Sequence, residues 1–251
     1  MSDLESNDSS LVHVCAFRVS RESRPFAEIA TWLSSEERKR ADRFFKEADR
    51  KRFVLGRAMV RHLCAAHLGV TPGVVKLEQT SNGKPYLAYP TEVAERRFEF
   101  NVAHSGDCVL IAWSLGQPMG IDVEALDRDP PVLVNDVATA AFSDAERMVL
   151  NAAAPDQIAA TFYRTWVRKE AVLKAEGCGI GGRLQSFSVA RRHEARTEWV
   201  DQLQYPDSGR IWKMVDLAPA PGHLAALALP EAVIARIETP DCAPFTLRRE
   251  T

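Results

Sequence analysis

The sequence of 251 residues contains few cysteines, and they follow no pattern of metal ligands or disulfide bridges. Its five cysteines (Cys15, Cys64, Cys108, Cys178 and Cys242) are widely scattered, with no Cys-x-x-Cys and no histidine at zinc-ligand spacing. A sparse and odd number of cysteines is typical of reduced thiols in the cytosol. This pattern argues against a disulfide-stabilised scaffold.

Long apolar runs and an excess of one charge are also missing. No apolar run approaches the length of a membrane span, and the polar, acidic segment Met1–Ser10 resembles neither a signal nor a transit peptide. With 32 basic and 34 acidic residues the formal net charge is −2, which argues against a dedicated nucleic-acid binder. We expect a soluble, cytoplasmic protein with neither a membrane nor a nucleic acid as partner.

The predicted elements occur twice in the same order along the chain, with a helical region followed by several strands. In the first half we expect a strand over 11–19, helices over 34–45 and 49–68, and strands over 98–103, 108–114 and 119–124. After a connector at Asp127–Pro131 we expect a helical region from Ser143, a helix over 157–176, and strands over 185–190, 197–202, 210–217 and 223–229. This order predicts an α+β fold with two similar halves, residues 1–125 and 126–251, although no residue-level repeat is visible. Clefts between such halves often bind ligands.

A pair of carboxylates lies in the segment Gly120-Ile121-Asp122-Val123-Glu124. Residues two apart in a strand point to the same face, so Asp122 and Glu124 would project together while Ile121 and Val123 pack behind them. Two adjacent carboxylates repel unless a cation or a proton lies between them, and hard oxygen ligands suit Mg²⁺. A solvated strand face explains these five residues equally well.

Glu146 is a third carboxylate of interest, and two interpretations compete for it. The segment Ser143-Asp144-Ala145-Glu146 matches the Ser-x-x-Glu capping box, in which the glutamate folds back onto the start of its own helix. The alternative is a metal ligand, and one side chain could not easily do both. From these residues alone the cap is the stronger interpretation.

The segment from Phe162 to Gly177 predicts one helix with an acid and a base on the same face. Glu170 and Lys174 are four residues apart, so they would be poised for proton transfer if this helix lines a cleft. A solvated ion pair that only supports the helix is the commoner explanation. The glycine-rich segment Gly177–Gly182 follows a helix, so it predicts a helix end and not a dinucleotide-binding loop.

Several residues could bind phosphate groups. His104 and Ser105 follow a predicted strand, although a histidine with a single hydrogen bond at the surface or in the core is commoner. A hydrolase triad is a weak interpretation here, since no Gly-x-Ser-x-Gly elbow is present. The segment Arg38–Arg61 holds ten basic and three acidic residues, most of which should form a solvated face, while some could bind a compact multi-phosphate ligand. Lys84, in the turn Asn82-Gly83-Lys84-Pro85, is either a further phosphate ligand or a plain exposed lysine.

Taken together, five motifs resemble the 4′-phosphopantetheinyl transferases, in particular the surfactin-synthetase-activating type. They are Asn82-Gly83-Lys84-Pro85, Phe100-Asn101-Val102-Ala103-His104-Ser105-Gly106, Gly120-Ile121-Asp122-Val123-Glu124, Phe142-Ser143-x-x-Glu146 and Trp166-Val167-Arg168-Lys169-Glu170-x-x-x-Lys174. Each motif is weak alone, but their order and spacing over roughly Ser34 to Ser188 are specific. The resemblance implies two similar halves in a pseudo-twofold arrangement, and a monomer, because one chain would supply the whole cleft.

The resemblance also implies an activity and roles for residues. Phosphopantetheine would be transferred from coenzyme A to a serine of an apo acyl or peptidyl carrier protein, with release of 3′,5′-ADP. Mg²⁺, or Mn²⁺, would be bound by Asp122, Glu124 and Glu146, which replaces the cap as our preferred role for Glu146. Glu170 would be the general base, with Lys174 at the leaving oxygen and His104 also in the catalytic set. The groups expected to hold the coenzyme A phosphates are Arg40, Arg52, Lys84, His104, Ser105, Lys169 and Lys174.

Two positions depart from the family pattern, and two other functions stay open. Ala103 stands where many members have Ser or Thr, and Glu37 where some have lysine, so the phosphate contacts should differ there. A Mg²⁺-dependent phosphohydrolase could use the same carboxylates on a coenzyme A-like or nucleotide ligand. A binding module for coenzyme A or another polyanion would need only the basic helices. Glu170 and Lys174 beside three acids favour chemistry over binding alone.

Overall fold

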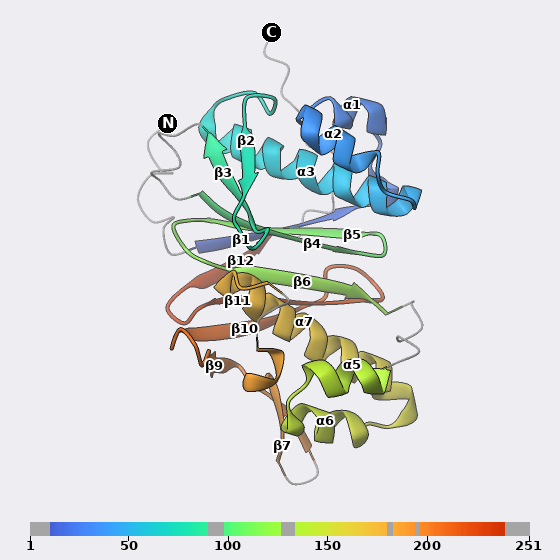
Figure 1. Cartoon of the computed structure of the whole chain (residues 1–251), viewed down its shortest axis with the longest axis vertical. Helices are drawn as coiled ribbons and strands as arrows, with labels where there is room; N and C mark the ends of the chain where they lie inside the picture. Colours follow the sequence, from blue (N-terminus) through green and yellow to red (C-terminus); the bar gives the residue numbers. More distant parts are fainter. Residues whose placement is uncertain (1–10, 90–97, 127–133, 180–182, 194–195, 239–251) are drawn as a thin grey trace.

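The computed structural model describes residues 11–89, 98–126, 134–179, 183–193 and 196–238. They form two four-stranded sheets that pack face to face, each covered on its outer side by a long helix (Figure 1). The layers therefore run helix, sheet, sheet, helix, and the predicted α+β fold of two similar halves is confirmed. The predicted connector Asp127–Pro131 and residues 180–182 of the glycine-rich segment lie outside the described residues.

The first sheet belongs mainly to the first half of the chain. Its strand order is β12-β1-β5-β4, with β1 at Leu11–Arg18, β4 at Phe98–Ser105, β5 at Cys108–Leu115 and β12 at Ile234–Glu238. The 3₁₀ turn η2 (Val19–Arg21) leads to three helices, α1 (Phe26–Ala30), α2 (Ser35–Ala41) and α3 (Glu47–Leu68). A small hairpin of β2 (Lys76–Gln79) and β3 (Pro85–Tyr89) follows them.

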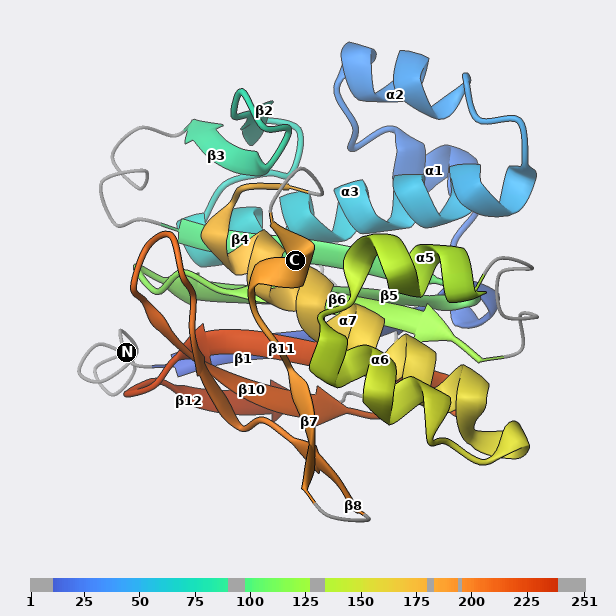
Figure 2. The same ribbon diagram turned by 60° about the horizontal axis from the view of Figure 1, so that its bottom comes forward.

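The second sheet carries the other long helix. Its strand order is β6-β11-β10-β9, with β6 at Gly120–Ala125, β9 at Gln202–Gln204, β10 at Ile211–Leu217 and β11 at His223–Pro230. Its helices are α5 (Val134–Ala141), α6 (Asp144–Asn151) and α7 (Ile158–Glu176), with 3₁₀ turns η3 (Pro155–Gln157) and η4 (Leu184–Ser186). Figure 2 shows α7 crossing this sheet with α5 and α6 beside it, and the hairpin of β7 (Ala190–His193) and β8 (Arg196–Trp199) beyond them.

Several helix ends lie where the sequence predicts them, although α2 ends at Ala41 and not at residue 45, and α3 begins at Glu47 and not at residue 49. The hydroxyl of Ser34 accepts a hydrogen bond from the amide of Glu37, whose carboxylate accepts one from the amide of Ser34, so a capping box starts α2. Helices α3 and α7 end at Gly69 and Gly177, with φ of 66° and 72°. Glycine adopts this left-handed conformation without the steric cost of a side chain. None of the helices in the described ranges is both long and apolar enough to cross a lipid bilayer.

The apolar core lies between the sheets and under both long helices. The inter-sheet layer holds alternate residues of the facing strands, among them Val14, Leu110, Ile121, Val123 and Leu227. Because side chains of a strand alternate between faces, the remaining residues of these strands face outward toward α3 or α7. The expectation that Ile121 and Val123 pack behind Asp122 and Glu124 is therefore confirmed.

The two sheets do not divide at residue 125, where the sequence analysis placed the boundary between halves. Strand β6 pairs with β11 in the second sheet, and β12 returns to pair in parallel with β1 in the first. Pairing between strands distant in sequence leaves no local signal, which explains the misplaced boundary. The strand predicted over 185–190 is also wrong, because η4 occupies Leu184–Ser186 and β7 begins at Ala190. Helices α1 and α5 and strands β2, β3, β9 and β12 were not predicted.

Strand β6 and helix α7 approach each other so closely that only glycine fits between them. A methyl group built on Gly120 would lie 2.0 Å from the carbonyl oxygen of Ala171 and 2.4 Å from the amide nitrogen of Ala175. Both neighbours are helix backbone, which cannot move aside as a flexible side chain would. Gly120 therefore sets the distance between the strand that carries Asp122 and the helix that carries Glu170.

A buried ion pair joins α6 to α7. The ammonium of Lys169 lies 2.7 Å from one carboxylate oxygen of Glu146 and donates to the carbonyl of Phe187 at 2.7 Å, and neither charged side chain reaches solvent. The other Glu146 oxygen accepts from the amide of Val189 at 2.8 Å. The amide of Ser143 also donates to this carboxylate, at 2.8 Å, which completes a second capping box. The ion pair and hydrogen bonds of the Glu146 carboxylate thus connect α6, α7 and the segment before β7.

We predict that Gly120→Ala destabilises the protein, because the new methyl group would overlap the backbone of α7. Inserting atoms into a packed core typically costs about 1–3 kcal/mol or more, so urea unfolding should show at least such a loss. Gly73→Ala is the matched control, since nothing lies within 4 Å of a methyl group there. Equal stability of the two variants would contradict the close approach of β6 and α7.

We also predict that Glu146→Gln lowers the free energy of unfolding by about 3–5 kcal/mol, because it leaves the Lys169 ammonium buried without its countercharge. The exposed pair of Glu36 and Lys39 supplies the control. Glu36→Gln should change stability by less than about 1 kcal/mol. Chemical denaturation of both variants measures the difference, and similar small losses would show that the buried pair is not structural.

Candidate active site

A groove runs along the junction between the two halves. It consists of two adjoining hollows of about 210 and 230 Å³ that share Gly83, Pro85 and Val102 as lining residues. The first hollow lies under the basic helices and is lined by Arg40, Arg52, Phe53, Gly56, Arg57, Gln79 and His104. The second reaches α7 and is lined by Asn82, Lys84, Asn101, Glu170, Leu173, Lys174, Gly177 and Gly179. One ligand could therefore contact both halves.

The acids of β6 project toward α7 near this groove. Lys174 donates from its ammonium to an Asp122 carboxylate oxygen at 2.7 Å and to the carbonyl of Ile121 at 3.1 Å. Glu124 accepts a hydrogen bond of 2.6 Å from the hydroxyl of Ser105. Burial raises the pKa of Asp122, and the Lys174 ammonium opposes that rise. The alternation of β6 brings both acids to the helix that carries the predicted acid-base pair.

Glu170 is the third carboxylate that the structure brings to these acids. Burial raises its pKa, the negative charge of Asp122 raises it further, Lys174 opposes the rise and Glu124 adds to it. One carboxylate oxygen of Glu170 and one of Asp122 are buried with no hydrogen-bond partner among the described residues. Such buried oxygens are costly unless a cation, a proton or a donor satisfies them. A cation, a proton or a hydrogen-bond donor that contacts these two oxygens would therefore stabilise the site.

The structure does not bring Glu146 into this group. Its carboxylate is fully enclosed and is occupied by Lys169 and by the amides of Ser143 and Val189. The capping box that the sequence indicated is present, so the assignment of Glu146 as a metal ligand needs correction. Lys169 needs the same correction as a coenzyme A ligand, because its buried ammonium binds Glu146 and the carbonyl of Phe187.

Ser105 is also placed differently from our expectation as a phosphate ligand. Its side chain is only 3% exposed, and its hydroxyl accepts from the amide of Ala125 at 3.1 Å while donating to Glu124. With its hydrogen used and an amide on its oxygen, this hydroxyl has no room for a phosphate oxygen. Ser105 contacts the site through Glu124.

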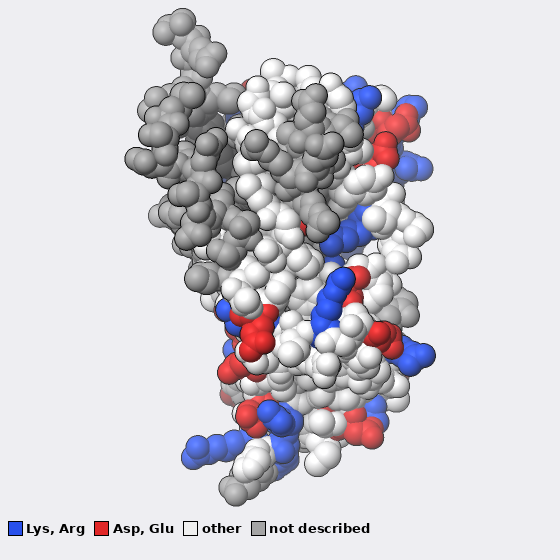
Figure 3. Space-filling model, turned by 90° about the vertical axis from the view of Figure 1, so that its left-hand side faces the viewer, with Lys and Arg blue, Asp and Glu red and all other residues white. Residues whose placement is uncertain are grey.

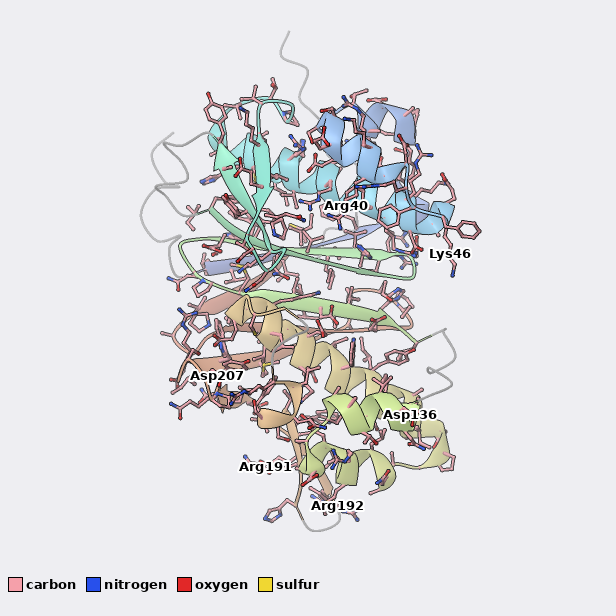
Figure 4. All side chains as sticks on the ribbon, viewed as in Figure 1. Arg40, Lys46, Asp136, Arg191, Arg192 and Asp207 are labelled. Carbon is pink, nitrogen blue, oxygen red and sulfur yellow. The ribbon has the colours of Figure 1, made fainter. Side chains whose placement is uncertain are left out.

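The first hollow forms the basic end of the groove. Of its basic side chains, Arg52 already binds protein groups, whereas Arg40 and His104 are exposed. Arg52 is buried and donates to the carbonyl of Gly106 at 2.7 Å and to Asp49. Arg40 is exposed and lies over the ring of Phe53, on the side of α2 facing α3 (Figure 4). His104 reaches solvent, but partial desolvation at the groove wall and then the charges of Arg52 and Lys174 lower its pKa. A neutral His104 near pH 7 can donate one ring N–H to a phosphate.

Arg57 is a groove residue that the sequence analysis did not single out. Burial lowers its pKa, Glu37 opposes this, and the neighbouring charges of Arg40 and Arg61 lower it again. Its carboxylate neighbour Glu37 lies 3.9 Å away and is bound by Arg61 at 2.8 Å. Glu37, which departs from the family pattern, therefore pairs more closely with Arg61 than with Arg57. In sequence Arg57 is one of ten bases, and only the folded structure places it in the lining of the first hollow.

The turn between β2 and β3 closes the groove from the other side. The side-chain amide of Asn82 donates to the carbonyl of Gly177 at 3.0 Å, which joins the turn to the end of α7. Lys84, in the same turn, lies 3.9 Å from Glu99 and lines the groove. Lys84 is therefore a lining residue of the groove, and its role as a phosphate ligand stays a prediction.

A divalent cation fits the donor set, although the described residues contain no ready-made metal cluster. No group of three or more His, Cys, Asp or Glu side chains in the described ranges is arranged to hold a metal by itself. The two unpartnered buried oxygens of Asp122 and Glu170 nevertheless offer hard ligands, with Glu124 beside them. Mg²⁺ commonly takes one or two carboxylates and completes its shell with phosphate oxygens and water. The residues fit such an ion.

Charge is mixed on one face of the molecule. On the face shown in Figure 3, basic and acidic side chains are interspersed and form no single large patch. Arg191 and Arg192, on β7, lie at the opposite end of the molecule from Arg40 (Figure 4). The basic end of the groove is thus a local feature in a protein whose formal net charge is −2.

Comparison with known proteins identifies the family. Residues 20–115 match the model of the 4′-phosphopantetheinyl transferase N-terminal domain, and residues 118–228 match that of the 4′-phosphopantetheinyl transferase superfamily. The chain is 33% identical over 221 residues to 4′-phosphopantetheinyl transferase HetI of Nostoc sp., covering 88% of each chain. It is 29% identical to 4′-phosphopantetheinyl transferase Sfp of Bacillus subtilis, over 71% of this chain and 73% of Sfp.

A more distant relative shows how widely the likeness extends. The human L-aminoadipate-semialdehyde dehydrogenase-phosphopantetheinyl transferase is 29% identical over 157 residues, which cover 61% of this chain and 51% of the human one. The two family models together include strands β4, β5, β6, β9 and β10, most of β11, and all the residues that line the groove. The chain belongs to the 4′-phosphopantetheinyl transferase superfamily and is an enzyme that transfers phosphopantetheine to carrier proteins.

Proposed function

We propose that the protein takes the 4′-phosphopantetheine group from coenzyme A, attaches it to a serine of an apo acyl or peptidyl carrier protein, and releases 3′,5′-ADP. The observation that carries this proposal is the continuous groove, which leads from a basic hollow to Glu170 and Lys174. Coenzyme A has phosphates at one end and a pantetheine arm at the other. A groove with cations at one end and a more apolar lining beyond Val102 matches that order.

The cations of the first hollow would hold the phosphates. Arg40 and Arg57 both contact the Phe53 ring, with guanidinium carbons 5.2 and 5.7 Å from its centroid. A planar guanidinium can donate two parallel hydrogen bonds to a phosphate, which makes arginine suited to this task. His104 and Lys84 extend the same chain of donors toward α7. Arg52 keeps its bonds to Gly106 and Asp49, and it contributes mainly positive potential.

The transfer step needs a base for the serine hydroxyl, and Glu170 is placed for it. As the serine oxygen bonds to the phosphorus that carries the pantetheine arm, its proton passes to the Glu170 carboxylate. The bond from that phosphorus to the oxygen of 3′,5′-ADP breaks, and the electron pair leaves with that oxygen. Glu170 lines the second hollow, and a positioned general base typically contributes about 10²–10⁴-fold to a rate.

Lys174 would support the leaving group from the same face of α7. Its ammonium already binds Asp122 of β6, and Lys174 lines the groove. A positive group placed where negative charge develops stabilises the transition state more than the ground state. Mg²⁺ (or Mn²⁺) bound by Asp122, Glu124 and Glu170 would supply a further positive charge at the pyrophosphate. Glu146 has no part in this step.

We further propose that the protein acts as a monomer in the cytoplasm. Both walls of the groove come from one chain, so a second copy is not needed to complete the site. The scattered cysteines of the sequence suit a reducing compartment. The proposal does not depend on whether the carrier belongs to fatty-acid, polyketide or nonribosomal peptide synthesis, because each of these carriers offers a serine on which this chemistry acts.

We predict that Glu170→Gln lowers the rate of transfer to an apo carrier protein by about 10²–10⁴-fold, because the amide cannot accept the serine proton. Binding of coenzyme A, measured by calorimetry, should persist. Glu176→Gln on the same helix is the control, since its carboxylate binds Ser208 and Trp212 outside the groove. Near-normal turnover of the Glu170 variant would remove this residue from the mechanism.

We predict that Arg57→Gln and Arg40→Gln each raise KM for coenzyme A about tenfold with little change in kcat. A charge-assisted hydrogen bond is worth roughly 1.5–3 kcal/mol, and its loss would weaken the binding of coenzyme A equally in the ground state and in the transition state. Lys39→Gln, on the outer side of α2 and paired with Glu36, is the control. Steady-state kinetics against coenzyme A separates the two constants. An unchanged KM in the Arg57 variant would place the phosphates elsewhere.

A further inference from the structure

Two strands from different sheets, β4 and β6, meet at the groove and are joined through side chains. Asn101, on β4, accepts a hydrogen bond from the amide of Ile121 at 3.3 Å. Four residues further along both strands, the hydroxyl of Ser105 accepts from the amide of Ala125 at 3.1 Å. Asn101 and Ser105 therefore hold the segment of β6 that carries Asp122 and Glu124 at both of its ends.

Ser105 does more than hold the backbone of β6. A serine hydroxyl has a single hydrogen, and here that hydrogen is donated to Glu124 at 2.6 Å. The amide of Ala125 occupies the oxygen from another side, so rotation of the hydroxyl away from Glu124 would lose this bond. The side chain is 3% exposed, so water cannot readily replace it as the donor.

We propose that Ser105 is a positioning residue for the cation site, which fixes one oxygen of Glu124 and thereby orients the other toward a divalent ion. This inference rests on the proposed function, in which Glu124 is a ligand. A donor behind a ligating carboxylate limits its rotation and lowers the cost of ordering it on binding. Loss of such a partner typically weakens metal affinity about 10–100-fold.

Ser114 provides a matched control on the neighbouring strand β5. Its side chain is also fully buried, and its hydroxyl likewise makes two hydrogen bonds, to the carbonyl and the amide of Gln117. Neither bond involves an acid of the site. Ser105→Ala and Ser114→Ala therefore each remove two hydrogen bonds, and only Ser105→Ala removes a donor from Glu124.

The test is Mn²⁺ binding to the purified protein without coenzyme A, followed by electron paramagnetic resonance of the free ion. Ser105→Ala should weaken the Mn²⁺ dissociation constant at least about tenfold, whereas Ser114→Ala should stay within about threefold of the wild type. Thermal unfolding should show comparable losses for both variants. If Ser105→Ala does not fold, Ser105→Cys is measured instead, since a thiol of similar size is a weaker donor and should also reduce affinity.

Three results would overturn the proposal, and they are distinguishable. Equal Mn²⁺ affinity of Ser105→Ala and the wild type would show that Ser105 does not position Glu124, while the proposed transfer chemistry would stand. An equal loss in Ser114→Ala would assign the effect to general destabilisation. No binding of Mn²⁺ by the wild type, with transfer to a carrier still observed, would remove the cation site on β6 and this inference with it.

Discussion

The close contact between β6 and α7 is the constraint on which the site depends. At Gly120 the strand lies so near the helix that a methyl group would be 2.0 Å from the carbonyl oxygen of Ala171. This distance lets Lys174 reach Asp122 at 2.7 Å and brings Glu170 into the electric field of both β6 acids. A wider separation would leave three carboxylates and a lysine on unrelated surfaces. The contact between β6 and α7 therefore determines which acidic and basic side chains lie together in the site.

Two sets of polar contacts hold β6 and α7 in this arrangement. One orients the helix, and the other holds the strand at the groove. The ion pair of Glu146 and Lys169 joins α6 to α7 away from solvent, so it orients the helix and offers nothing to a ligand. The hydrogen bonds of Asn101 and Ser105 hold β6 against β4, at the edge of the groove. Breaking a buried ion pair costs several kcal/mol, whereas altering the donor behind one carboxylate changes the site more than the fold.

The sequence predicts local features of this protein well, and it predicts the site in part. The alternation in Gly120–Glu124 places both acids on one face, and Ser34, Gly69 and Gly177 mark helix ends as their chemistry requires. The role of Glu146 shows the limit. The Ser-x-x-Glu pattern indicated the cap correctly, but the resemblance to the family outweighed it, and only packing shows which acid faces Asp122.

Other features have no local signal in the sequence. The pairing of β12 with β1 and of β6 with β11 joins strands far apart in the chain, so the halves could not be delimited from element order. Arg57 lines the first hollow while Glu37 pairs mainly with Arg61, and both arrangements depend on tertiary structure. The departure at Glu37 was visible in the sequence, but its partner was not.

The most direct test of the account is one reaction in which two products are measured together. An apo carrier protein is incubated with this protein, coenzyme A and Mg²⁺, and its intact mass and the released 3′,5′-ADP are followed in parallel. The account predicts that each carrier gains one phosphopantetheine for each 3′,5′-ADP released, and that carrier lacking the acceptor serine yields neither. Release of the nucleotide without a gain in carrier mass would identify a phosphohydrolase and contradict the account.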